Sequence, residues 1–91
     1  MIFSTLVYSD DKMVLGLEVF NNKAQCGLCH TLEAAASNGM IGPNLDQLKP
    51  QKEQIAYVVS NGIGVMPAFE DTLTPEEIEA VINYVFNSIN K

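Results

Sequence analysis

Residues 26–30 read Cys26-Gly27-Leu28-Cys29-His30, and the rest of the chain is best understood from this stretch. Cys26 and Cys29 are the only cysteines in the sequence, and His30 is the only histidine. On one turn of helix, two thiols at this spacing point the same way, and the imidazole follows directly. Gly27 has no side chain, which leaves room for a flat group to approach the backbone. The stretch therefore offers two thiols and one imidazole to a single bound group.

A C-x-x-C-H pattern is typical of the covalent attachment of c-type haem. The two thiols would reach the two vinyl groups of one porphyrin, and the imidazole of His30 would ligate the iron. A thioredoxin-like redox pair also uses C-x-x-C, but it expects alternating strands and helices, which the sequence does not show. A zinc site would lack a fourth Cys or His ligand, and a disulfide across so short a loop would stabilise little. The motif favours haem, and a second axial ligand would make it specific.

Met66 is the best candidate for that second ligand. It lies in Gly62-Ile63-Gly64-Val65-Met66-Pro67-Ala68-Phe69, where the glycines let the backbone fold tightly against a flat ring and the proline stiffens the chain. A thioether is a soft, weak donor that favours reduced iron. Met40 lies in an expected turn much nearer the motif and is the weaker candidate, and Met13 falls on an expected helix. The alternative for Met66 is a core methionine that fills a gap.

A turn between the two candidate ligands reads Gly42-Pro43-Asn44-Leu45. A ligand histidine usually donates its other ring N–H to a backbone carbonyl, which sets the orientation and basicity of the ring. Pro43 is suited to present its carbonyl rigidly. Read alone, the tetrapeptide is only a turn, and its position between the two ligands suggests this role.

Three helices are expected from the hydrophobic spacing, over residues 10–21, 51–60 and from Pro75 to the end. The third has the strongest signals, with Thr74 as N-cap, Pro75 at the first position and Glu77 completing a capping box. A short helix is expected near residues 32–36. No alternating run is long enough for a strand, so the predicted fold class is all-α. The long irregular stretches, 22–50 and 61–73, are interpreted as walls of a cofactor pocket.

The 91 residues correspond to one domain. Residues 1–9 are interpreted as an N-terminal extension or the remnant of an export signal, and residues 10–91 as the domain itself. The apolar start is too short to cross a membrane and lacks the basic residues of a signal peptide. The formal charge of −6, from eleven acids and five basic residues, argues against nucleic acid or an anionic membrane as partner. Four of the lysines, at positions 12, 23, 49 and 52, lie nearer the expected haem segments than the acids that crowd the last third.

The sequence closely resembles class I cytochromes c of the small soluble bacterial type, over roughly residues 16–85. The matching elements occur in the order of that family: Gly16-x-x-x-Phe20, the motif at 26–30, the turn at 42–45, Met66-Pro67-Ala68-Phe69 and Val81-x-x-Tyr84. The resemblance implies the class I cytochrome c fold, in which the N- and C-terminal helices cross and helices and loops wrap around one covalently attached haem. Gly16 would then let the two helices cross closely, with Phe20 and Tyr84 packed at the crossing.

The resemblance also implies the site. His30 and Met66 would be the axial ligands of the iron, with Pro43 as the carbonyl partner of His30, and no residue has a catalytic role. Tyr57 matches a helix position that often faces the haem. The expected haem-binding set is Cys26, Cys29, His30, Pro43, Tyr57 and Met66. One departure from the family is the six-residue spacing of Phe20 and Cys26, which is longer than in many relatives.

The implied function is one-electron transfer by one low-spin haem c, not an enzyme activity. The chain would shuttle electrons between periplasmic partners of a respiratory chain, such as a dehydrogenase, a cytochrome bc1 complex or a terminal oxidase. Export to the periplasm is expected because c-type haem is attached there, and the expected state is a monomer or a transient complex. Two alternatives stay open: an electron-accepting haem subunit of a periplasmic dehydrogenase, of the sulfite dehydrogenase type, and a ligand-binding haem sensor.

Overall fold

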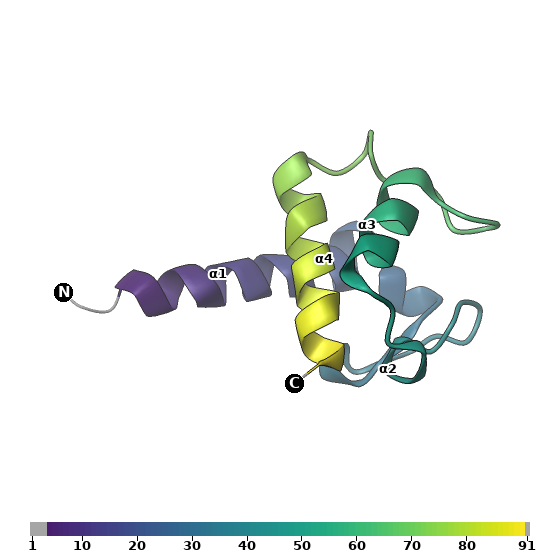
Figure 1. Ribbon diagram of the computed structural model, residues 1–91, viewed down its shortest axis with the longest axis horizontal. Coiled ribbons are helices and arrows are strands. Elements are labelled where there is room, and N and C mark those ends of the chain that lie inside the picture. The colour runs from purple at the N-terminus through teal and green to yellow at the C-terminus, as the bar shows by residue number, and fades with distance from the viewer. Residues whose placement is uncertain (1–3, 91) are drawn as a thin grey trace.

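The computed structural model describes residues 4–90 as helices joined by irregular segments, which confirms the all-α class (Figure 1). The elements, in chain order, are α1 Ser4–Glu18, η1 Val19–Lys23, η2 Cys26–Leu28, β1 Thr31–Leu32, η3 Glu33–Ala35, β2 Ser37–Asn38, α2 Leu45–Leu48, α3 Lys52–Asn61 and α4 Pro75–Ile89. Of the η elements, η1 is a π-helix and the other two are 3-10 helices. Within the described residues, no helix is both long and apolar enough to cross a membrane.

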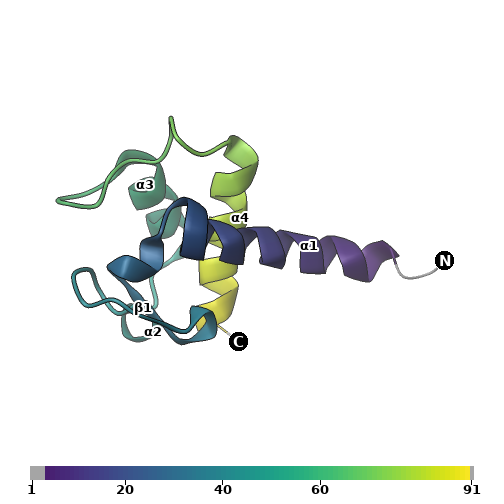
Figure 2. The same cartoon turned by 180° about the vertical axis from the view of Figure 1, so that it is seen from behind.

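Helices α1 and α4 cross, as both views show (Figures 1 and 2). At the crossing, a Cβ atom built on Gly16 would lie only 2.5 Å from the carbonyl oxygen of Ala80. Next to it, the rings of Phe20 and Tyr84 pack with centroids 6.2 Å apart and planes inclined by 54°. The expected close crossing is therefore confirmed, and it depends on a glycine because any side chain at that point would meet backbone.

The beginning of the first helix differs from the sequence prediction. The structure starts α1 at Ser4 instead of residue 10, and its last part continues without a break into the π-helix η1. In η1 the amide of Ala24 donates to the carbonyl of Val19 at 2.8 Å, a bond that encloses one residue more than an α-turn. The division at residues 9 and 10 falls within α1 and stays a prediction, and residues 1–3 lie outside the described part.

The C-terminal helix α4 forms as its sequence signals predict. The hydroxyl of Thr74 accepts a bond from the amide of Glu77 at 3.1 Å, and the Glu77 carboxylate accepts one from the amide of Thr74 at 2.9 Å. Pro75 occupies the first turn. The buried face of α4 supplies much of the core, through Ala80, Val81, Tyr84, Val85 and Ile89.

The segment after the cysteine motif has more local structure than expected. The helix predicted near residues 32–36 is a 3-10 turn, η3, between two antiparallel two-residue strands that pair Thr31 with Asn38 and Leu32 with Ser37. The short helix α2 was not anticipated; it begins because the side chain of Asn44 accepts a bond from the amide of Gln47 at 3.2 Å. These short elements fold the irregular stretch back on itself.

Helix α3 ends at Asn61, one residue beyond the expected end, and Gly62 follows with a φ of +75°. The segments between β2 and α2 and between α3 and α4 project on the same side of the molecule, away from the free end of α1 (Figures 1 and 2). The first of these segments contains Pro43 and the second contains Met66. The crossing helices therefore form a base from which both segments extend.

Candidate functional site

The cysteine motif occupies the turn η2 and its exit. The amides of Cys29 and His30 both donate to the carbonyl of Cys26, at 3.1 and 2.9 Å, so one helical turn sets the spacing of all three side chains. The turn is entered through Gln25, which has a φ of +54°. Both cysteines are free thiols, not a disulfide. Burial raises the pKa of the Cys26 thiol to about 11, so in the polypeptide it is protonated at neutral pH.

The ring of His30 is held by one turn, which contains Gly42 and Pro43. Its Nδ1 atom lies 2.7 Å from the carbonyl oxygen of Pro43, and because a carbonyl only accepts, the imidazole is the donor. A Cβ atom on Gly42 would lie 2.6 Å from the ring carbon Cε1, so the backbone of this turn presses against the imidazole. The amide of Gly42 also donates to the carbonyl of Cys29 at 2.6 Å. With Nδ1 occupied, Nε2 is the nitrogen left for a metal.

Met66 closes a short hairpin. The amide of Ile63 donates to the carbonyl of Met66 at 3.1 Å, and the Met66 amide donates back at 2.9 Å. Gly64 at the tip has a φ of +57°, and a Cβ on Gly62 would lie 2.7 Å from the Met66 carbonyl oxygen, so both glycines are required by the backbone path. The side chain of Met66 is half-buried against the core. The hairpin thus presents one thioether in a defined place.

The other candidate residues take different positions. Met40 is 87% exposed, and Met13 packs against the core on α1. Tyr57 lies on α3 with 65% of its surface exposed, and its proposed contact with haem stays a prediction. Sequence reasoning did not single out Gly39, where a Cβ atom would lie 2.6 Å from the amide nitrogen of His30. The turn signal Asn38-Gly39 marked the position, but not the close contact with the motif.

The site has the donors and the surface that a c-type haem requires. Two thiols could bond the vinyl groups of a porphyrin, and an imidazole with an available Nε2 and a thioether are side chains that could ligate its iron. Several large apolar side chains in and beside the segments that contain Pro43 and Met66 are 57–87% exposed. They are Met40, Ile41, Leu48, Ile63 and Val65. Exposed apolar surface of this kind marks a binding region. Among the side chains of residues 11–90, no group of three or more His, Cys, Asp or Glu could hold a metal ion directly.

The lysines of the described chain all contact α4. The Nζ atoms of Lys12 and Lys23 lie 3.4 and 3.3 Å from carboxylates of that helix, and Lys49 donates to the Ile89 carbonyl at 2.8 Å. Lys52 lies over the ring of Phe86, 5.8 Å from its centroid. The hydrogen bonds and ion pairs of these four lysines are therefore made with α4, and in the described part of the chain none is made with the segments that contain Pro43 and Met66.

Comparison with known proteins agrees with this geometry. Residues 13–85 match the family described as cytochrome C oxidase, cbb3-type, subunit III. The crystal structure of the c-type cytochrome SorU from Sinorhizobium meliloti superposes with a TM-score of 0.82 at 51% identity, covering 90% of this chain and 95% of that one.

Two curated relatives are named cytochrome c6. The chloroplastic protein of Chlamydomonas reinhardtii is 38% identical over 82 residues, which are 81% of this chain, and the match spans about half (53%) of that protein's length. The protein of Tetradesmus obliquus is 35% identical over 85 residues, 82% of this chain and 89% of that protein. With a family match over most of its length and the donor set described above, the chain belongs to this cytochrome c family: it is a class I monohaem c-type cytochrome, an electron carrier with one covalently bound haem c.

Proposed function

We propose that this electron carrier holds its haem through Cys26 and Cys29, with His30 and Met66 as the two axial ligands. The observation that supports this best is the 2.7 Å contact between His30 Nδ1 and the Pro43 carbonyl oxygen. An imidazole that donates from Nδ1 to a carbonyl has its free lone pair on Nε2, which is the tautomer that a metal ligand needs. The carbonyl also makes the ring a stronger donor.

Met66 is the second proposed ligand of the iron. When bound, the haem supplies one iron that accepts and releases a single electron. A thioether favours the reduced state, so Met66 raises the reduction potential. Because its hairpin is closed by two backbone bonds, the backbone at Met66 has little freedom to move. A ligand set that changes little on electron transfer keeps the reorganisation small, which suits a shuttle.

The partners of such a carrier are expected to present a basic face. The chain has a formal charge of −6, and the side chains of the described lysines contact groups of α4. Glu70 and Asp71 follow Met66 closely in the segment between α3 and α4 and are exposed. We place the exchange in the periplasm, where c-type haem attachment occurs. The rate of electron transfer with the partner should fall as ionic strength rises, because salt screens the electrostatic attraction between the two proteins. A rate independent of salt would contradict this.

Visible spectra with and without carbon monoxide test the ligand assignment. We would compare the wild-type holoprotein with Met66→Leu, which keeps the volume but removes the donor, and with Met40→Leu, the same change at the exposed methionine. The wild type and Met40→Leu should be low-spin in both oxidation states and should bind carbon monoxide only slowly. Met66→Leu should bind carbon monoxide readily and have a lower reduction potential.

Two results would overturn the assignment. Rapid binding of carbon monoxide by the wild type would mean an open site and would favour the sensor alternative. An effect of Met40→Leu with none of Met66→Leu would move the ligand to Met40. No observation on this chain favours the sensor or the dehydrogenase subunit over the carrier.

A further inference from the structure

The segment between α3 and α4 holds Met66 and is fastened at both ends. On the α3 side, the amide of Phe69 donates to the carbonyl of Val59 at 2.9 Å. On the other side, the segment ends at Thr74, the N-cap of α4. Val59 and the start of α4 are therefore two points at which the Met66 segment is attached to the helices.

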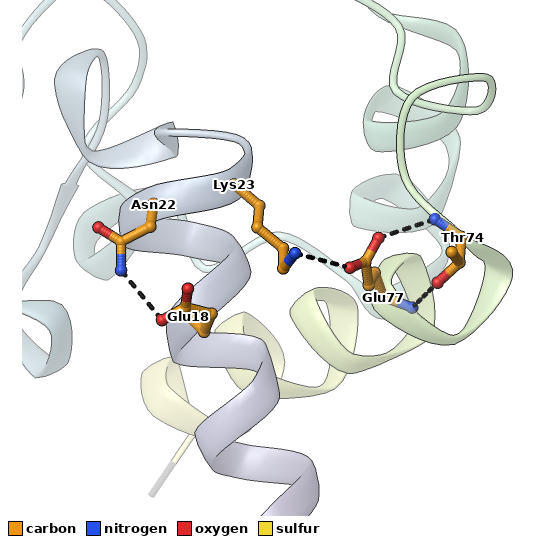
Figure 3. Close-up of polar contacts among 5 residues, drawn as sticks. All are labelled: Glu18, Asn22, Lys23, Thr74 and Glu77. Carbon is orange, nitrogen blue, oxygen red and sulfur yellow. Dashed lines mark hydrogen bonds and ion pairs between the residues drawn. The ribbon is translucent and has the colours of Figure 1, made fainter.

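One carboxylate holds Thr74 and a second segment at the same time. Figure 3 shows the two oxygens of Glu77 in separate contacts. Oε1 accepts from the amide of Thr74 at 2.9 Å, and Oε2 lies 3.3 Å from Nζ of Lys23. The Glu77 side chain is only 17% exposed, whereas that of Lys23 is 45% exposed. The carboxylate is thus partly shielded and well placed to join the two groups.

Lys23 belongs to the segment that leads into the cysteine motif. It is the last residue of the π-helix η1, three positions before Cys26. In the same turn, the side chain of Asn22 donates to Glu18 at 3.0 Å (Figure 3). The π-turn accommodates the long Phe20-to-Cys26 spacing and brings Lys23 to the N-terminal end of α4. As a result, the segments that supply the two axial ligands are joined through Lys23, Glu77 and Thr74.

We propose that the Lys23–Glu77 ion pair is a positioning contact for Met66, which limits how often the thioether leaves its ligand position. This inference rests on the proposed ligation by Met66. Lys23 and Glu77 act through Thr74 and the end of the Met66 segment, since neither contacts the thioether in the structure. An ion pair with only a general stabilising role would affect the whole fold and not this segment in particular.

The chain offers a matched control. Lys12 and Glu79 also join the N-terminal helical region to α4, at 3.4 Å, but Glu79 lies further into the helix and holds no backbone group of the Met66 segment. Lys23→Gln and Lys12→Gln each remove one cation and one ion pair. Lys23→Arg keeps the charge and serves as the conservative variant.

The test is made on the reduced holoprotein. Carbon monoxide can bind the iron only when the thioether of Met66 has dissociated from it. The rate of carbon monoxide binding therefore reports how often the thioether leaves. Lys23→Gln should accelerate this binding about two- to fivefold, the range expected from loss of an exposed ion pair. Hydrogen exchange at the amides of Phe69 and Thr74 should accelerate as well. Lys12→Gln and Lys23→Arg should keep the wild-type rates.

The outcomes separate this inference from the proposed function. If Lys23→Gln and Lys12→Gln change the rates equally, or if Lys23→Gln changes nothing, the positioning role is wrong while Met66 ligation stands. If the wild type itself binds carbon monoxide without delay, ligation by Met66 fails, and the positioning role fails with it. A double variant, Lys23→Gln with Glu77→Gln, should bind carbon monoxide no faster than Glu77→Gln alone, because the two side chains act as one pair.

Discussion

The Nδ1 atom of His30 lies 2.7 Å from the carbonyl oxygen of Pro43, and the residue before that proline, Gly42, lies against the same ring. A Cβ atom at position 42 would be 2.9 Å from Nδ1 and 3.0 Å from Nε2. The orientation of the imidazole therefore depends on a carbonyl that attracts one nitrogen and on a glycine that leaves room for the ring. Both come from one turn, and the amide of Gly42 attaches this turn to Cys29.

Gly42→Ala should disturb this arrangement without unfolding the chain. The new methyl group displaces the ring, weakens the bond to Pro43 and makes the imidazole a poorer donor to oxidised iron. The reduction potential should therefore rise by roughly tens of millivolts, since second-shell changes alter metal binding by about 10-fold or more and a tenfold change is about 59 mV for one electron. Voltammetry measures this. Gln47→Ala, an exposed position on α2, is the control, and equal potentials in both variants would contradict the prediction.

Gly16→Ala should destabilise the crossing of α1 and α4. Its Cβ would meet the Ala80 carbonyl oxygen at 2.5 Å, and backbone atoms cannot turn aside. We expect a loss of about 1–3 kcal/mol from overpacking, which outweighs the gain of about 1 kcal/mol that alanine brings to a helix. Urea unfolding of the holoprotein measures it. Val14→Ala, on the exposed side of α1, should change stability by less than about 0.5 kcal/mol.

Gly64 tests backbone strain alone, because no atom lies within 4 Å of a Cβ built there. With a φ of +57°, alanine at this position should cost about 1–2 kcal/mol. Gly64→Asn should cost less, since asparagine tolerates the left-handed region. Unfolding by urea would compare the two variants. Equal stability of Gly64→Ala and the wild type would mean that the hairpin of Met66 takes another conformation in solution.

Stability should depend on pH through Glu77. The bond from the Thr74 amide, together with Lys23, lowers the pKa of Glu77 below its usual 4.5. A carboxyl whose pKa is lower in the folded state stabilises the fold above its unfolded pKa, and this contribution is lost as pH falls through the folded pKa. Glu77→Gln should therefore be less stable than the wild type at neutral pH, and the difference should disappear in acid. Unfolding measured from about pH 7 to about pH 3 checks this, and a constant difference would exclude it.

The sequence was most informative where the signal is local. The capping box of Thr74 and Glu77 was predicted, because a helix cap depends on a few neighbouring residues. The same is true of the spacing of Cys26, Cys29 and His30, which one helical turn determines. The crossing at Gly16 and the all-α class were also expected, and the structure confirms both.

The extent of the first helix could not be predicted in the same way. Its ending as a π-helix depends on how the chain must pass Tyr84 and reach Cys26, which no local pattern encodes. The contact of Gly39 with Cys29 and His30 was not predicted for the same reason, because it joins two separate segments. The short helix α2 was not predicted either, although its cap at Asn44 is local.

By itself, the sequence determined the chemistry of this protein: two thiols, one imidazole and a thioether in a glycine-rich segment define the ligands that a haem can use. Only the tertiary structure decided how these groups are held. In it, the Pro43 carbonyl accepts a hydrogen bond from His30, and Lys23 forms an ion pair with Glu77. The other described lysines also contact α4. The reason is that residue types and short spacings specify what can bond, whereas contacts between distant segments depend on the packing of whole helices.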